Sequence, residues 1–312
     1  MPPLIRIGTR RSALALAQSG MMQRAIAAAM GLTTEQVVLV EIVTTGDRIQ
    51  DRRLLEVGGK ALFTKEIEEA LLDGRVDIAV HSMKDVPAEQ PPGLTLAAIP
   101  EREDARDAFI SRDFDGFDAL PVGAHLGTAS LRRQAQALAL RPDLQIEMLR
   151  GNIDTRLRRA DDGEFDAILL ASAGLNRLGR ADAVRERLSI DSFLPAPGQG
   201  ALALQTREGD TDHAWVAALN HAPTALAIAA ERGAMVALEG SCRTAVGAHA
   251  VIEDGRLTLT TEMLAPDGSA HWRRTGTMDV VPGIDETEAA HALGLRLGHE
   301  VHVSAGDQSF DG

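Results

Sequence analysis

The sequence is poor in cysteine, with a single one, Cys242, among 312 residues. One cysteine cannot form an internal disulfide, so a disulfide scaffold and a multi-cysteine metal cluster are excluded, and no metal site is predicted. No run of about 18 uncharged apolar residues occurs, and the residues from Met1 to Ile7 lack a basic segment followed by a long apolar one. These absences predict a cytoplasmic protein without a membrane-spanning segment.

Positive charge is also scarce. Lys and Arg number 32 against 45 Asp and Glu, a formal net charge of −13. Phosphate backbones and anionic membranes repel such a chain unless its charges are sharply segregated, so neither nucleic acid nor membrane is a predicted partner. Only three of the cations are lysines, Lys60, Lys65 and Lys84. Their grouping suggests a task for compact ammonium charges, and chance clustering on a solvated face explains it equally well.

What the chain does have is 45% hydrophobic residues, enough to bury sizeable cores. Short β-rich runs alternate with segments of helical period from the first residues onward, which is typical of βαβ units and parallel sheets. A middle block carries its own alternation, including a helix expected over 181–187. Residues 201–206 are then expected to return to the first domain as a strand.

The pattern changes after residue 224. A long Ala-rich helix precedes three alternating strands separated by two Asp-Gly turns, which predicts an antiparallel meander. The predicted fold is therefore α/β, with two doubly wound domains and a small α+β C-terminal domain. The expected boundaries are 1–99 with 200–219 for the first domain, 104–194 for the inserted second domain, and 223–312 for the third.

Two short motifs have the composition of anion sites. Residues 7–12 (IGTRRS) and 126–133 (LGTASLRR) both run from a strand through Gly-Thr into a helix start with Ser and paired Arg. Free amides of a first helical turn, with Ser and Arg donors, suit an anion. One such turn is more often an ordinary N-cap. Two of them, one in each α/β domain, favour a shared cleft for an anionic ligand.

Further arginines follow predicted strands at Arg150, Arg156 and Arg177. Singly, each is best explained as a solvated surface charge. Together with the paired arginines they would form a cationic lining, which suits a small ligand with several carboxylates better than a polymer.

A polar cluster ends another predicted strand, in the segment from Asp77 to Pro87. Asp85, beside Lys84, could stay ionised among cations and stabilise a developing positive charge or exchange protons. The alternative is a capping Asp in a loop. His81, at the strand end, is more often structural than catalytic.

Cys242 follows a helix on a turn with small and polar neighbours and with Arg243 beside it. A lone cysteine is usually an inert hydrophobe, but such residues tend to lie in apolar runs. This context predicts an accessible thiol that favours the thiolate, so covalent attachment of a group is a reasonable hypothesis.

With these motifs the chain resembles the porphobilinogen deaminase (hydroxymethylbilane synthase) family from nearly its first residue to the end of the third-domain core. The resemblance rests on separate motifs in one order: Gly8–Ser12 with Gln18, Gly58–Glu66, Asp77–Pro87, Leu131–Gln134, Leu149–Asn152, Thr155–Leu157, Pro197–Gly200, Glu231-Arg232 and the turn with Cys242.

The resemblance implies an enzyme of tetrapyrrole biosynthesis, a transferase that joins four porphobilinogen molecules head to tail, releases ammonia at each step and hydrolyses the product to hydroxymethylbilane. It implies two domains resembling periplasmic binding proteins around a cleft, and a monomer. It also implies a dipyrromethane cofactor attached by a thioether to Cys242. Asp85 would be the main catalytic group, assisting loss of ammonia and stabilising the cationic azafulvene intermediate.

The family's other functional residues carry over by position. Those implied to hold the cofactor are Lys84, Ser82, Asp47, Thr128, Ser130, Arg132, Arg133, Arg150 and Gly151. Those implied to hold the substrate are Arg10, Arg11, Ser12, Gln18, Lys60, Arg156, Arg177 and Gln199.

The chain departs from the family's pattern at a few positions. Glu56 stands where a second lysine is frequent, and Ala129 replaces a usual serine. Ser241, Arg243 and Ala245 differ from the usual Gly, Gln and Pro around the cysteine. The tail from Val301 matches poorly, and no function is assigned to it.

Two other classes of function fit parts of the sequence. A non-catalytic receptor for small anions would share the two-domain architecture, and a secretory signal would favour it. A cysteine hydrolase would use Cys242 with a histidine, and alkylation of the thiol would inactivate the freshly purified protein.

Overall fold

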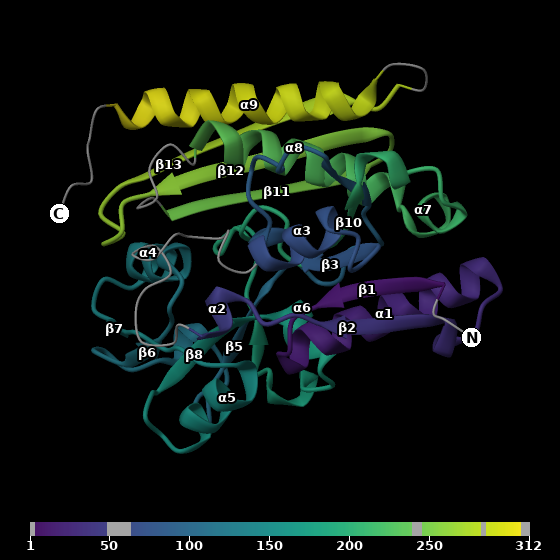
Figure 1. Ribbon diagram of the computed structural model, residues 1–312. Helices are drawn as coiled ribbons and strands as arrows, with labels where there is room; N and C mark the ends of the chain where they lie inside the picture. Colours follow the sequence, from purple (N-terminus) through teal and green to yellow (C-terminus); the bar gives the residue numbers. More distant parts are fainter. Residues whose placement is uncertain (1–3, 49–63, 239–244, 282–284, 307–312) are drawn as a thin grey trace. The chain divides into compact units, whose positions relative to one another are not determined.

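The computed structural model describes residues 4–48, 64–238, 245–281 and 285–306, and the chain forms two compact units (Figure 1). The first unit comprises Met1–Glu103 and Ala201–Ala225, and the second comprises Asp104–Gly200 and Leu226–Gly312.

The first unit is built on a five-stranded sheet. Its order is β2 (Val37–Glu41), β1 (Ile5–Thr9), β3 (Ile78–Ser82), β10 (Leu202–Arg207) and β4 (Leu94–Ala98). β1 runs parallel to β2 and β3, and β10 runs antiparallel to β3 and β4. The strand expected at 201–206 is thus β10, which lies inside this sheet.

Among the described residues of this unit, the sheet is accompanied by α1 (Ala13–Met30), α2 (Thr45–Arg48), α3 (Lys65–Leu72) and α7 (Ala214–Leu219). α1 begins at the N-cap Ser12 and ends at Gly31, whose φ of 64° is in the left-handed region that glycine adopts without strain. Ile7, Ile26 and Trp215 are buried in the core between sheet and helices.

The second unit contains another five-stranded sheet. Its order is β7 (Gln145–Glu147), β6 (His125–Gly127), β8 (Ala167–Ala171), β5 (Asp107–Ile110) and β9 (Glu186–Arg187). β6 runs parallel to β7 and β8, and β5 runs antiparallel to its neighbours. The accompanying helices are α4 (Leu131–Leu140), α5 (Ile153–Asp161) and α6 (Ser172–Arg177).

The helix expected over 181–187 is wrong. A 3-10 turn spans Ala181–Ala183, and β9 follows it. Edge pairing overrides the local helical pattern because β9 pairs with β5 and the Glu186 carboxylate accepts the Phe117 amide at 2.8 Å.

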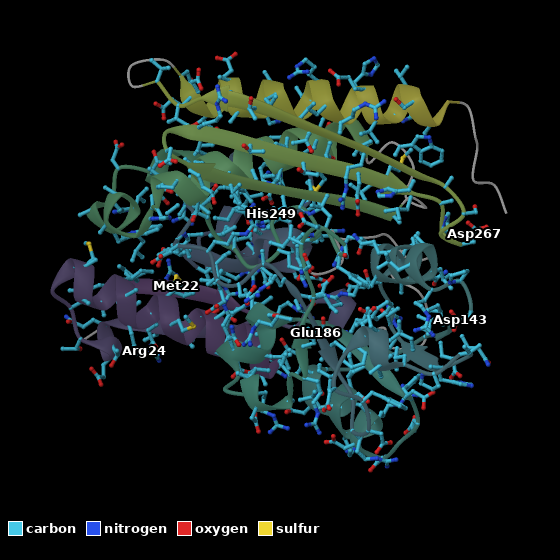
Figure 2. All side chains as sticks on the ribbon, turned by 180° about the vertical axis from the view of Figure 1, so that it is seen from behind. Met22, Arg24, Asp143, Glu186, His249 and Asp267 are labelled. Carbon is cyan, nitrogen blue, oxygen red and sulfur yellow. The ribbon has the colours of Figure 1, made fainter. Side chains whose placement is uncertain are left out.

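The rest of the second unit is an antiparallel sheet of β11 (Ala245–Glu253), β12 (Arg256–Leu264) and β13 (His271–Asp279), with α8 (Ala222–Leu238) and α9 (Glu286–Ala305). Both Asp-Gly turns are present, and Figure 2 labels Asp267 in the second of them. The apolar faces of α8 and α9 pack with Leu257 and Leu259 of the sheet in one core. The predicted fold class, two doubly wound α/β domains and a small α+β C-terminal domain, is confirmed.

Candidate active site

One cluster of predicted site residues lies at an edge of the first sheet. β2, β1 and β3 run parallel, so their carboxyl ends share that edge, and the strand order reverses at β1. Open α/β sheets bind ligands at such switch points. β1 leads there into Arg10, Arg11 and Ser12, and β3 leads into residues 82–85. The topology therefore makes neighbours of two motifs that are about 70 residues apart in the chain.

The start of α1 is joined to the end of β3. Ser12 Oγ accepts the Ala15 amide at 3.3 Å, which caps the helix. Gln18, buried one and a half turns further on, donates from Nε2 to Ser82 Oγ at 3.0 Å. The Gln18 side chain thus ties Ser82, at the end of β3, to the first turns of α1, where Ser12 caps a helix end that favours negative charge.

Lys84 and Asp85 lie on a 3-10 turn, Met83–Asp85, directly after β3. The Met83 amide donates to the Ala201 carbonyl at 3.0 Å, and the Val86 amide donates to the Met83 carbonyl at 3.1 Å. Met83 and Val86 are buried, whereas Lys84 and Asp85 are half-buried. The apolar anchors therefore hold the charged pair at the carboxyl edge.

His81 lies behind this turn with a buried ring. Gln205 donates from Nε2 to Gln90 Oε1 at 2.9 Å, so its Oε1 accepts the His81 Nε2 proton across 3.0 Å. Burial lowers the pKa of His81 to about 4; the Gln205 hydrogen bond and the charge of Asp85 oppose the shift, and Arg10 adds to it. The imidazole is thus neutral at pH 7, as expected of a structural histidine, and Asp85 and Arg10 both act on it electrostatically.

The lowered pKa of His81 predicts acid sensitivity. Between pH 6.5 and about 4 the unfolded chain binds a proton that the folded chain excludes, so stability falls as pH falls through this window. The expected slope is up to about 1.4 kcal/mol per pH unit. Urea unfolding at pH 7 and pH 5 measures it, and His81→Gln should flatten the loss. The exposed His302 is the matched control, since His302→Gln should keep the wild-type slope. Equal pH dependence in all three proteins would contradict the assignment.

The remaining predicted residues of this unit are not part of the hydrogen-bonded contact between α1 and β3. Arg11 is exposed and pairs with Glu41 at 3.2 Å. Asp47 is in α2, whose first residue, Thr45, donates its amide to Glu66 Oε1 at 2.8 Å. The Asp47 side chain and all of Lys60 lie outside the described residues.

The second cluster of predicted residues lies at the corresponding edge of the second sheet. β7, β6 and β8 run parallel, and the strand order reverses at β6. β6 leads into Thr128 and Ser130, and β7 leads into Arg150 and Gly151. The Thr128 hydroxyl accepts the Ser130 amide at 3.1 Å, and Ser130 Oγ caps α4. Two helix starts, α4 and α5, therefore follow the parallel strands of this sheet.

Three arginines follow the parallel strands of this sheet: Arg150 in the loop after β7, Arg156 in α5 and Arg177 at the end of α6. Arg156 donates from Nε to the Gly151 carbonyl at 2.7 Å, and Arg177 donates from Nη2 to the Gly200 carbonyl at 2.6 Å. Arg150 Nη1 is buried and has no hydrogen-bond partner among the residues that the structure describes. Gly151 has φ 117°, which strains any residue with a Cβ. Arg150, directly before this glycine, thus has a guanidinium donor that no described residue accepts.

Arg132 and Arg133 differ from the open cationic lining that the sequence suggested. Their exposed fractions are 5% and 6%, and both donate to Asp107, which is 0% exposed. Gln199 is buried with them and donates from Nε2 to Asp107 Oδ1 at 2.8 Å. Burial raises the pKa of Asp107, but the two guanidiniums outweigh it and hold the pKa far below its usual range. The paired arginines are thus locked into a buried ionic cluster.

The comparisons with known proteins decide the family. Residues 5–214 match the family model "Porphobilinogen deaminase, dipyromethane cofactor binding domain", and residues 225–302 match "Porphobilinogen deaminase, C-terminal domain". The chain belongs to the porphobilinogen deaminase family. The porphobilinogen deaminase of Caulobacter vibrioides is 58% identical, with 98% of this chain and 97% of that protein covered. That of Phenylobacterium zucineum is 56% identical, with 98% of each covered.

Solved structures with a similar chain trace are distant in sequence. A YaeC-family lipoprotein of Enterococcus faecalis is 14% identical with a TM-score of 0.42, covering 69% of this chain and 88% of that one. A periplasmic substrate-binding protein of an ABC transporter from Coxiella burnetii is 16% identical with a TM-score of 0.43, covering 73% and 96%.

The described residues fit the dipyrromethane group after which the family's first domain is named. Such a group carries acid side chains. The carboxyl edge of the second sheet, called the second edge below, offers two capped helix starts and several guanidiniums. Arg132 Nε and Arg150 Nη1, both buried, find no hydrogen-bond partner within the described part of the chain. Unsatisfied buried donors of positive charge are suited to an anionic group.

Several features bear on the other sequence predictions. Cys242, Ser241, Arg243 and Glu56 lie outside the described residues. Across residues 4–48, 64–238, 245–281 and 285–306, no set of three or more His, Cys, Asp or Glu side chains could hold a metal ion. No helix in those ranges has the length and hydrophobicity needed to span a bilayer. The poorly matching tail begins inside α9, which continues to Ala305.

The prediction of site residues missed three buried residues that share one hydrogen-bond network in the second unit: Asp107, Gln136 and Glu262. For Asp107 the available signal is an acid at the first position of the apolar strand DAFI. Gln136 Nε2 donates to Glu262 Oε1 at 2.6 Å across 126 residues of sequence, a pairing without any local pattern.

Proposed function

We propose that this protein is a hydroxymethylbilane synthase, the activity of the porphobilinogen deaminase family. It joins four porphobilinogen molecules head to tail, releases ammonia at each step and hydrolyses the chain to hydroxymethylbilane. The family match over residues 5–214 and 225–302 carries the proposal. The match also disfavours the non-catalytic anion receptor.

Within the first unit, Asp85 is the proposed catalytic residue. Loss of ammonia from an aminomethyl pyrrole leaves positive charge on the ring system, and a carboxylate at that place stabilises the charge. The half-buried position of Asp85 strengthens this effect relative to water. Asp85 can also accept and return a proton during bond formation. Lys84 then binds an acid side chain of the cofactor, and Arg10 binds an acid side chain of the substrate.

Substrate contacts on the same edge come from residues held by α1. Ser12, Gln18 and Arg11 supply hydroxyl, amide and guanidinium donors for acetate and propionate groups. Ser82, fixed by Gln18, contributes to cofactor binding. We assign Lys60 and Asp47 the substrate and cofactor roles that the family resemblance implies.

Within the second unit, the proposed cofactor residues are Thr128, Ser130, Arg132, Arg133, Arg150 and Gly151. When bound, dipyrromethane supplies the two pyrrole rings on which the product chain is assembled. Arg156, Arg177 and Gln199 bind carboxylates of the substrate. The hydroxyls and amides of the capped helix starts orient these groups, and the buried arginines neutralise them.

The cofactor is attached through a thioether to Cys242. The position of this cysteine in the family's C-terminal motif supports the assignment, as does the polar turn around it. A cytoplasmic location, a monomeric state and the three domain boundaries stay predictions from the resemblance and the sequence pattern.

Intact-mass measurement under denaturing conditions tests the attachment. Wild type and Cys242→Ser are incubated with porphobilinogen and then denatured. We expect an added mass of two linked pyrrole units on the wild type alone, since only a thiol can form the thioether. Wild type is also expected to resist thiol alkylation, because its sulfur is capped. A bare wild-type chain that still consumes porphobilinogen would contradict the thioether, and an adduct on Cys242→Ser would move the attachment elsewhere.

A further inference from the structure

The buried ionic cluster of the second unit is centred on one carboxylate. Asp107 Oδ2 accepts Arg132 Nη1 at 2.8 Å, and Oδ1 accepts Arg133 Nη2 at 2.8 Å and Nε at 3.0 Å. Oδ1 also accepts Arg132 Nη2 at 3.2 Å and Gln199 Nε2 at 2.8 Å. Asp107 therefore accepts five hydrogen bonds from described residues, four at Oδ1 and one at Oδ2, and its side chain is fully buried. Two adjacent guanidiniums that would otherwise repel each other are held in fixed planes.

The surrounding contacts complete the frame. Arg132 Nη1 also donates to Gln136 Oε1 and to the Leu194 carbonyl, both at 2.8 Å. Arg133 Nη1 donates to the Leu169 carbonyl at 3.2 Å. These acceptors are neutral, so one carboxylate faces two guanidiniums in direct contact with it. Counted over the residues that the structure describes, the cluster therefore retains one excess positive charge.

The acid closest along the hydrogen-bond network does not remove this excess. Gln136 links Arg132 to Glu262, but Glu262 already pairs with Arg273 at 2.7 Å and with His271 at 2.9 Å. The pKa of Glu262 is lowered, because these partners and Gln136 outweigh its burial. Glu262 is thus ionised and occupied by its own cation. The charge left at the arginine pair favours an incoming anion.

We propose that Asp107 is a positioning residue of the site: it fixes the planes of Arg132 and Arg133 and leaves exactly one of their two charges for an anionic ligand. Asp107 touches no ligand itself, because its carboxylate is fully buried behind the two arginines and Gln199 that donate to it. The inference rests on the proposed function, which makes the ligand a carboxylate of the cofactor or of the growing chain. For this role the carboxylate must have both its negative charge and its exact location between the two guanidiniums.

Asp107→Glu tests position separately from charge, because it keeps the carboxylate and moves it by one methylene. Asp104 offers a matched control three residues upstream: it also pairs with two arginines, Arg106 at 2.8 Å and Arg187 at 3.2 Å, and neither is an arginine of the proposed site. Asp104→Glu therefore makes the same chemical change outside the cluster.

Three quantities are measured on full-length proteins: the fraction of chains with the covalent adduct by intact mass, KM and kcat for porphobilinogen, and the thermal unfolding midpoint. Asp107→Glu is expected to lower the adduct fraction or to raise KM by about tenfold relative to Asp104→Glu, with a similar midpoint. Adduct fraction and KM equal to those of Asp104→Glu would overturn the proposal, since charge compensation alone would then suffice.

A second variant tests the proposal if Asp107→Glu does not fold. Gln199 Oε1 lies 3.4 Å from Nη2 of both arginines, so Asp107→Asn with Gln199→Glu moves the carboxylate within the cluster at constant charge. A folded double variant with a reduced adduct fraction supports positioning, and a wild-type fraction overturns it. The proposed function is judged separately on wild type and Asp104→Glu, which must carry the adduct whatever the Asp107 variants do.

Discussion

Asp85→Asn is expected to lower kcat for porphobilinogen by about 10²- to 10⁴-fold, with a much smaller change in KM. The amide keeps the size of the side chain and removes its negative charge and its capacity to accept a proton. Both losses act when ammonia leaves and positive charge develops, so they raise the barrier more than they weaken substrate binding. Steady-state kinetics on protein with a verified adduct measures the effect.

Asp77→Asn is the matched control, because Asp77 lies just before the opposite end of the same strand, β3. It pairs with Arg6 at 2.7 Å and lies 3.5 Å from Arg207. Burial raises its pKa, but the Arg6 hydrogen bonds and charge outweigh this and lower it. Asp77→Asn should therefore cost stability and leave kcat of the folded enzyme unchanged. If Asp85→Asn retained kcat within a factor of about three of this control, Asp85 would not be the catalytic group.

Gly294→Ala is expected to destabilise the second unit by about 3 kcal/mol or more. Gly294 lies on α9 where this helix crosses α8, and a Cβ there would be 2.0 Å from the Ala230 carbonyl oxygen and 2.7 Å from the Ala234 amide nitrogen. Both are backbone atoms, so relief requires separating the helices. Separation opens the core that they share with Leu257 and Leu259.

Gly20→Ala provides the opposite result in another helix. Gly20 lies in α1. The atom nearest to a Cβ added there would be Nη1 at the flexible end of Arg24, 3.6 Å away. The alanine should stabilise by about 0.5 to 1 kcal/mol, because it restricts the unfolded chain and fits the helix. Thermal unfolding of wild type and both variants makes the comparison. A midpoint for Gly294→Ala at or above that of wild type would show that the crossing tolerates separation.

Part of the candidate site was predictable because its signals are local. A Gly-Thr turn after an apolar strand and before a Ser-led helix predicts a capped helix start, and the structure has one at Ser12 and another at Ser130. The parallel strand order then follows from the βαβ alternation, and with it the shared edge that brings residues 10–12 beside 82–85.

Other features depended on contacts between distant segments. The helix expected over 181–187 gave way to β9 because an edge of the second sheet offered hydrogen bonds that the local pattern does not record. The sequence predicted that Arg132 and Arg133 form part of an open cationic lining, but Asp107 and Gln199, 25 and 66 or more residues away, enclose them. Whether an arginine is exposed or buried depends on which carboxylate meets it in the fold.

The sequence by itself determined the fold class, the family and the residue types of the site, because hydrophobic period, turn residues and motif order are properties of neighbouring positions. Tertiary structure alone decided which charges are neutralised and which remain for a ligand. Electrostatic energy depends on separation in space and on exclusion of water, and neither can be read from distance along the chain. At the second edge, Arg132 and Arg133 are neighbours in the sequence, but only the fold shows that both pair with the buried Asp107.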